Sequence, residues 1–161
     1  MMKLTGILAL LLLLGAGCDR LFWVGMSPDS TPDKPVFLLG NSDDLSGSAL
    51  IYSATVSGRL RVLGPGDSLN SWHTCWAIEK DSGFPYVEVS NITYGIVPSS
   101  FHLVSGPESL PAGRLYFFAP QFHGLGRDAY FEIYLDSSGT RAIRGLTEDQ
   151  FQAIIHDTLG R

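Results

Sequence analysis

Ala129-Tyr130-Phe131-Glu132-Ile133-Tyr134-Leu135 is the stretch of sequence that decides the fold class. Every second residue from Ala129 to Leu135 is apolar, and the residues between them are two tyrosines and a glutamate. Because successive side chains of a β-strand point to opposite faces of the sheet, the apolar set should face a core. The stretch therefore predicts a half-buried strand.

The run before it, Arg114–Ala119, is apolar on both faces of an extended chain. A strand with two apolar faces is central in its sheet or covered by another element. We consider two explanations for the aromatic residues of this region. They form an outer face for a protein or glycan partner, or they lie beneath a helix. The residues concerned are Tyr116, Phe118, Tyr130 and Tyr134.

Short apolar runs broken by Gly, Pro, Asn, Asp and Ser fill the chain from residue 35 to residue 144. This pattern predicts an all-β fold, an antiparallel β-sandwich-like domain. Ser57-Gly58 and Asp136–Gly139 have the composition of hairpin turns. The other candidate strands are Val36–Leu39, Ala49–Val56, Arg59–Leu63, His73–Ile78, Tyr86–Val89, Ile92–Val97, Phe101–Val104 and Thr140–Ile143.

One C-terminal α-helix is expected over residues 147–159. Thr147 and Gln150 have the spacing of a capping box, and Leu146 and Phe151 have that of a hydrophobic staple. An apolar stripe follows one helix face and should pack across an outer sheet face or close one end of the sandwich. Its members are Phe151, Ile154, Ile155 and Leu159.

The composition is that of one globular domain with an apolar addition. The 161 residues are 45% hydrophobic and 17% charged, and the formal net charge is -5. Disorder needs lower hydrophobicity, nucleic-acid binding usually needs a basic surface, and a long coiled coil needs more charge. The composition disfavours all three classes.

The apolar addition lies at the N-terminus. Lys3 precedes an apolar run over residues 4–14, and three small residues lead from it to Cys18. This is the layout of an export signal, and the run is shorter than the about 20 residues of a membrane span. The segment Leu14-Gly15-Ala16-Gly17-Cys18 resembles the lipobox of bacterial membrane lipoproteins, with Gly15 where Leu is usual.

The resemblance to bacterial lipoproteins concerns processing and covers the first 18 residues. It implies that residues 1–17 are a lipoprotein signal peptide and that Cys18 carries lipid, palmitate included. It also implies a location in the bacterial cell envelope, with the body in the periplasm or at the cell surface. The alternative is an ordinary secretory signal, in which case Cys18 and Cys75 can pair in an oxidising compartment.

Residues 18–34 are expected to be the lipidated cysteine and a flexible tether, followed by a domain over residues 35–161. Ser27–Pro35 carries three prolines among small polar residues, which favours a semi-extended spacer. The apolar patch Leu21–Met26 is either a membrane-interface segment or a first strand of the body. Around Ile92–Pro98 and Leu110–Tyr116, the body resembles small β-domain envelope lipoproteins of unknown function.

The loop Pro120–Asp128 is the best candidate for ligand binding. It is longer than most hairpin connections, and long loops on β scaffolds often carry recognition. Phe122, His123 and Arg127 offer an aromatic anchor, a titratable ring and a cation. The alternative is a connector without a role of its own.

His73 and Cys75 would share one face of an expected strand, as a nucleophilic pair or part of a metal site requires. No third partner lies near them in the sequence, and Cys75 stands between Trp72 and Trp76. A buried structural cysteine is therefore the preferred interpretation. No catalytic motif or metal-ligand spacing is present, so we expect no catalytic residue, metal or cofactor.

These observations predict a non-enzymatic, lipid-anchored envelope protein with a binding or scaffolding role. Its expected partners are the membrane, through the anchor, and an envelope protein or glycan, with no nucleic acid. Two alternatives stay open. One is a secreted or envelope hydrolase that uses a histidine, His123 or His73, and the other is a metal or redox protein centred on Cys75.

Overall fold

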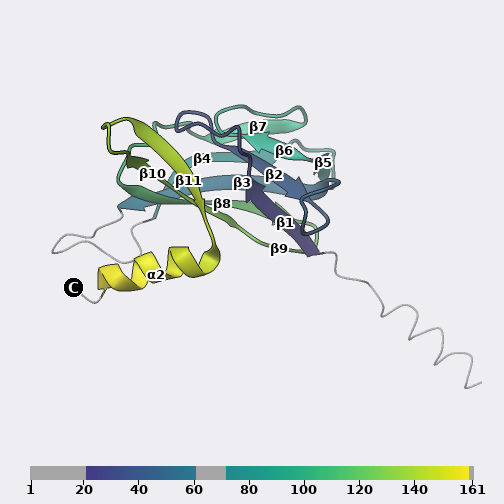
Figure 1. The fold of residues 1–161 in the computed structure, drawn as a ribbon. Helices are drawn as coiled ribbons and strands as arrows, with labels where there is room; N and C mark the ends of the chain where they lie inside the picture. The colour runs from purple at the N-terminus through teal and green to yellow at the C-terminus, as the bar shows by residue number, and fades with distance from the viewer. Residues whose placement is uncertain (1–20, 61–71, 160–161) are drawn as a thin grey trace, which may run out of the picture.

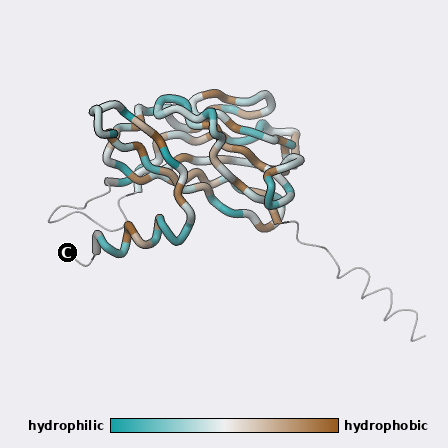
Figure 2. Tube along the Cα trace, viewed as in Figure 1, coloured by the Kyte–Doolittle hydropathy of each residue, from teal (hydrophilic) through white to brown (hydrophobic). Residues whose placement is uncertain are grey.

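Two β-sheets face each other, and one helix follows the last strand, in a computed structural model that describes residues 21–60 and 72–159 (Figure 1). The fold is all-β and antiparallel-rich with a C-terminal helix, as the sequence predicts. Hydrophobic and hydrophilic residues alternate along many of the strands (Figure 2). Cys18 and the expected signal peptide lie outside the described residues, as do the last residues of the expected strand Arg59–Leu63.

The smaller sheet has four strands in the order β6-β2-β1-β9. β1 pairs antiparallel with β2, and β9 pairs in parallel with only the first two residues of β1, Leu21 and Phe22. The rest of that edge of β1 has no strand beside it in the described part of the chain. The bounds are β1 Leu21–Met26, β2 Val36–Gly40, β6 Asn91–Thr93 and β9 Leu125–Gly126.

The larger sheet has seven strands. Six follow the order β11-β10-β8-β3-β4-β7, and β5 pairs with β3 beside them. All its pairings are antiparallel, and β11 forms one edge. The bounds are β3 Ala49–Leu60, β4 His73–Lys80, β5 Val87–Val89, β7 Phe101–Ser105, β8 Arg114–Phe122, β10 Ala129–Leu135 and β11 Arg141–Leu146.

The core lies between the sheets, and β10 contributes to it as predicted. Ala129, Phe131 and Ile133 are buried, whereas Leu135 at the strand end is 60% exposed. β8 is central, between β3 and β10. The ring of Phe118 stacks on Phe37 of the other sheet, with centroids 4.0 Å apart. Stacking of aromatic rings across the two sheets therefore fills the interior.

The explanation of the aromatic residues as an outer face is wrong for two of the four. Tyr116 stacks on Phe131 at 5.1 Å and is fully buried, and Phe118 is buried as well. Both therefore point into the sandwich. The two-sided apolar character of β8 comes instead from Phe117, which points outward and meets Trp72 edge-on at 4.9 Å.

Ser57-Gly58 is not a hairpin turn, because β3 continues through it from Ala49 to Leu60. The ladder with β4 is irregular at this point, between Val56 and Ser57. A Cβ on Gly58 would lie 2.5 Å from a ring carbon of Tyr116. The glycine is needed for a close approach to that ring and not for a chain reversal. The other expected turn, Asp136–Gly139, does connect the hairpin β10–β11.

The expected tether is corrected by the structure, because the folded body begins at Leu21 and not at residue 35. Leu21–Met26 forms β1, and Phe22 within it is 1% exposed. Phe22 stacks on Phe122 at 5.2 Å. The segment after β1 is also bound to the body, since Ser27 donates its backbone N–H to Val36 and Ser30 accepts from the Val36 N–H. Burial of Phe22 favours the strand over a membrane-interface segment.

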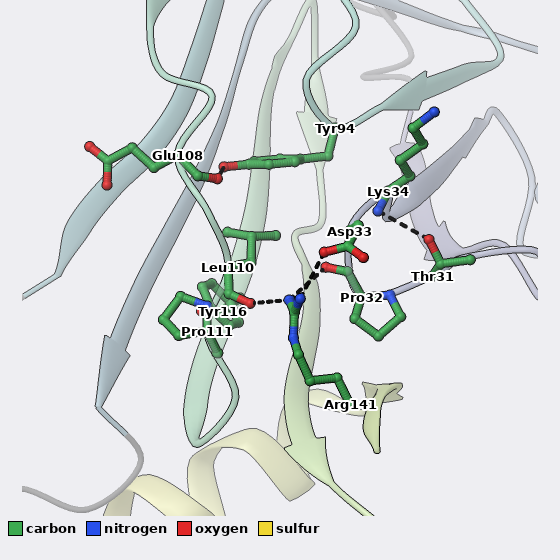
Figure 3. Close-up of polar contacts among 10 residues, drawn as sticks. All are labelled: Thr31, Pro32, Asp33, Lys34, Tyr94, Glu108, Leu110, Pro111, Tyr116 and Arg141. Atoms are coloured by element: carbon green, nitrogen blue, oxygen red, sulfur yellow. Dashed lines mark hydrogen bonds and ion pairs between the residues drawn. The ribbon is translucent and has the colours of Figure 1, made fainter. Parts of the chain in front are cut away.

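Arg141 holds the proline-rich segment against the larger sheet (Figure 3). Its guanidinium donates to Asp33 Oδ1 at 2.8 Å and to the carbonyl of Leu110 at 2.6 Å. In the same region the Tyr94 hydroxyl donates to the carbonyl of Glu108 at 2.6 Å, and the Tyr116 hydroxyl donates to that of Pro111 at 2.9 Å. These contacts fix two loops that have no regular structure of their own.

The helix α2, Glu148–Leu159, has the predicted capping box. The Gln150 N–H donates to Thr147 Oγ1 at 3.2 Å, and the Thr147 N–H donates to Gln150 Oε1 at 2.9 Å. Phe151 packs on Tyr130 at 4.3 Å and on Trp72 at 5.9 Å, so the helix covers part of the outer face of the larger sheet. Within the described ranges, no helix has both the length and the apolar character needed to cross a bilayer.

Candidate functional site

A groove of about 810 Å³ opens where the edges of the two sheets approach each other, and we call it the edge groove. It is the best candidate site because it joins four separate parts of the fold. Its lining comprises Trp23–Met26 of β1, the segment Gly126–Tyr130 before and within β10, Ile143–Leu146 of β11, and Thr147, Glu148 and Gln150 at the start of α2. Ser27, Pro28 and Ser30 complete it.

The two edge strands meet at one end of the edge groove. A Cβ on Gly145 of β11 would lie 3.8 Å from the Cβ of Met26, which is ordinary contact. From that contact the lining continues along β1 to Trp23 on one side, and into the first turn of α2 on the other. The groove therefore runs between a strand edge and a helix start, and β1 and β11 are in contact where it passes Met26.

The two cations that line the groove are already engaged. The Arg127 guanidinium lies over the Trp23 ring, 4.6 Å from its centroid. Arg144 forms an ion pair with the buried carboxylate of Glu132 and lies 5.4 Å from the Tyr134 ring centroid. A cation over an aromatic face is attracted by the ring quadrupole, so both arginines have a favourable place without a ligand.

The two carboxylates of the lining have no such partners. Asp128 and Glu148 make no hydrogen bond or ion pair with any described residue. Burial, and after it the charge of Glu148, raise the pKa of the Asp128 carboxyl above its usual range. Burial disfavours the charged form, and a like charge adds to the effect. The groove therefore presents two carboxylates without an ionic partner among the described residues, next to two arginines that are engaged elsewhere.

The three residues expected to form a loop site do not converge on one point. β8 extends through Phe122, so the connection to β10 is shorter than the sequence suggests. Phe122 packs on Phe22, and the His123 ring stacks on Tyr86 with centroids 4.0 Å apart. Only Arg127 lines the edge groove. Phe122 thus packs against the core, His123 lies on the surface, and Arg127 lies in the groove, so the three residues do not form one site.

Trp23, Asp128 and Glu148 line the groove and lie outside the site residues that the sequence predicts. Asp128 is the last residue of the loop Pro120–Asp128, and Glu148 lies at the start of the expected helix. Trp23 belongs to the patch Leu21–Met26, for which the sequence allows two interpretations. No local signal places the three together, because β1 pairs with β9 and lies near β10 only across a long stretch of sequence.

His73 and Cys75 do not form a catalytic or metal-binding pair. The His73 ring contacts Glu108, with Nε2 and Oε2 2.7 Å apart, on the exposed side of β4. Cys75 is 3% exposed, as the structural interpretation predicts, and its Sγ lies 3.6 Å from the His73 carbonyl oxygen. Burial, with a smaller effect of Glu108, raises the pKa of the Cys75 thiol. In the described ranges, no three His, Cys, Asp or Glu side chains are placed to hold a metal ion.

The alternative that uses His123 gains no supporting contact. A catalytic histidine needs an oriented partner such as a carboxylate. Among the residues that the structure describes, none places a carboxylate within ion-pair distance of His123, whose ring neighbour is Tyr86. The chain matches no protein-family model, no curated protein and no solved structure. The N-terminal sequence and the edge groove are therefore the observations that bear on function.

Proposed function

We propose that this chain is a lipid-anchored lipoprotein of the bacterial cell envelope with a non-enzymatic binding role. The observation that carries the proposal is the placement of Cys18, directly after an apolar run and three small residues and three positions before the folded body begins at Leu21. Acylation of Cys18 would add enough methylene groups for stable anchoring without a membrane-spanning segment.

The start of the body supports this placement. Three residues of extended chain reach at most about 11 Å, so an acylated Cys18 would hold the beginning of β1 close to the bilayer. Leu21 pairs with Leu125 of β9, and these side chains are 39% and 60% exposed. Exposed leucines beside the anchor are suited to the membrane interface. β1 then leads away from the anchor, toward Met26.

The edge groove supports the binding role. It has the size of a ligand site, and its lining combines apolar side chains with about as many polar and charged ones. Among the described residues, its lining includes no histidine or cysteine. The anchor keeps the groove at a membrane surface, and the groove supplies the surface that a partner would contact.

Metabolic labelling with an alkyne analogue of palmitate tests the anchor. The chain has two cysteines, so Cys75→Ala is a matched control for Cys18→Ser. We expect the unmodified chain and Cys75→Ala to be labelled and to fractionate with membranes. We expect Cys18→Ser to lose both properties. Membrane fractionation of Cys18→Ser at the original level, without label in any form, would refute the anchor.

A further inference from the structure

We propose that the edge groove binds an extended segment of a partner protein by strand addition to the free edge of β1, and that this segment carries a lysine or arginine. The inference deepens the proposed binding role and is independent of the lipid anchor. It rests on three features of the groove: the backbone groups of β1, those of β11, and the charges of the lining.

The first feature is the unpaired backbone of β1. The Ser27 N–H donates to the Val36 carbonyl at 2.8 Å, which fixes Ser27 and Val36 as a hydrogen-bonded pair of the antiparallel ladder. Such pairs alternate along the strand, so Gly25 and Trp23 also face β2. Val24 and Met26 consequently turn their N–H and C=O groups to the opposite edge, inside the groove.

The second feature is the matching edge of β11. The Asp136 N–H donates to the Thr140 carbonyl at 2.9 Å, so the same alternation along the hairpin directs Arg144 and Leu146 toward β10. Ile143 and Gly145 then direct their backbone groups away from β10, and both residues line the groove. Two rows of backbone donors and acceptors that pair with no other strand therefore border the groove. An extended peptide can form hydrogen bonds with such groups.

β9 shows that this edge of β1 accepts a strand. It pairs with Leu21 and Phe22 in parallel and ends at Gly126, which leaves the edge open from Trp23 onward. A bound segment would extend the pairing at the point where β9 stops. The four-stranded sheet would then gain a neighbour along β1 from the end of β9 to the contact between Met26 and Gly145.

The third feature is the charge of the lining. Asp128 and Glu148 have no ionic partner in the described part of the protein, whereas Arg127 and Arg144 lie on aromatic rings or a carboxylate. A lysine or arginine of the bound segment would find the two carboxylates free. The same charges disfavour a second copy of this chain, whose net charge is -5.

Selection from a library of random dodecapeptides, displayed on phage against the purified full-length chain, tests the proposal. We expect the selected peptides to alternate β-branched residues and to carry a lysine or arginine. A synthetic peptide from the selection should change the amide NMR shifts of Val24, Met26, Ile143 and Gly145. A norleucine in place of its basic residue should weaken binding, as should Asp128→Asn combined with Glu148→Gln.

Val24→Pro removes an edge N–H that the ladder with β2 does not use, and Val24→Ala is its matched control, since it shortens the side chain but keeps the N–H. We expect Val24→Pro to weaken binding about tenfold or more and Val24→Ala to change it less than about threefold. Should Val24→Pro not fold, methylation of alternate peptide amides blocks the same bonds from the ligand side. Methylation of the alternating set of peptide amides that faces β1 should abolish binding, and methylation of the other set should not.

Three outcomes would overturn the proposal. One is that no peptide binds the unmodified chain more tightly than it binds the Val24→Pro chain. Another is that the selected peptides still bind when either alternating set of their backbone amides is methylated. The third is a concentration-dependent dimer of the chain that Val24→Pro dissociates, which would assign the groove to a second copy. The Cys18→Ser chain should bind the peptide normally, so failure at the groove and failure of the anchor are separate results.

Discussion

Gly58 and Tyr116 face each other across the β3–β8 ladder, with no room for a Cβ between them. A Cβ on Gly58 would lie 2.5 Å from one carbon of the Tyr116 ring and 3.4 Å from the Cys75 Sγ. The ring is fully buried and stacks on Phe131, so it has no space into which to withdraw. The missing side chain at Gly58 thus leaves the space that the Tyr116 ring occupies.

Gly58→Ala should destabilise the fold by about 1–3 kcal/mol, the usual cost of overpacking a filled core. Urea denaturation followed by tryptophan fluorescence measures the effect. Gly145→Ala is the control, because its Cβ meets Met26 at an ordinary 3.8 Å and no positive φ is involved. Equal stabilities of the two variants would contradict the packing described for Tyr116.

Thr147→Ala should destabilise the docked helix by about 1 kcal/mol, because it removes the side-chain acceptor for the Gln150 N–H. Amide hydrogen exchange over α2 should rise, while exchange in β3 should not. Gln152→Ala, in the exposed middle of the helix, serves as the control. An unchanged exchange rate in α2 would mean that the capping box contributes nothing to docking.

Asp128→Asn should stabilise the protein at pH 7 by less than about 1 kcal/mol. The pKa of Asp128 is raised in the folded state, first by burial and then by Glu148. The unfolded chain therefore ionises first as the pH rises through about 4, and the stability of the unmodified protein falls from there upward. The advantage of Asp128→Asn should vanish below pH 4. An advantage that persists at pH 3 would show that its cause is not ionisation.

The unmodified protein should lose stability above about pH 9. Burial is the largest cause that raises the pKa of Cys75, Tyr94 and Tyr116. Since the unfolded forms of these groups lose their protons first, the free energy of unfolding falls as the pH rises past their ordinary values. Urea unfolding at pH 7 and at about pH 10 measures this decline.

Tyr116→Phe should lessen the alkaline decline, while Tyr52→Phe, at an exposed position, should leave it unchanged. A similar decline in both variants would place its cause elsewhere. Tyr116→Phe also removes the hydrogen bond to the Pro111 carbonyl, so the comparison uses the difference between the two pH values and not the stability at pH 7 alone.

Local patterns in the sequence predicted the features that depend on neighbouring residues. The alternation from Ala129 to Ile133 matches the core-facing side of β10, although Glu132 on the other side is also buried. The Thr147–Gln150 spacing matches the observed cap. The predicted turn at Ser57-Gly58 is wrong because glycine serves both chain reversals and close contacts. Which of these applies depends on Tyr116, which lies far away in the sequence.

The edge groove was not predictable for a related reason. Whether a strand has a free edge depends on the order of strands in the sheet, and that order places Trp23 beside Arg127 and opposite the start of α2. Arg127 was identified from the loop as a candidate cation, but its neighbours were not. The lipidation of Cys18 remains a prediction from the sequence alone.

The stacking of Phe22 on Phe122 has a consequence for the order of assembly. A polypeptide emerges from the ribosome or an export channel with its N-terminus first, so β1 is present long before β9. β1 and β2 can pair early because a short connection joins them, but Phe22 keeps its ring uncovered until the end of β8 arrives. Closure of the sandwich is therefore a late, non-local event, and folding should be slow for a domain of this length.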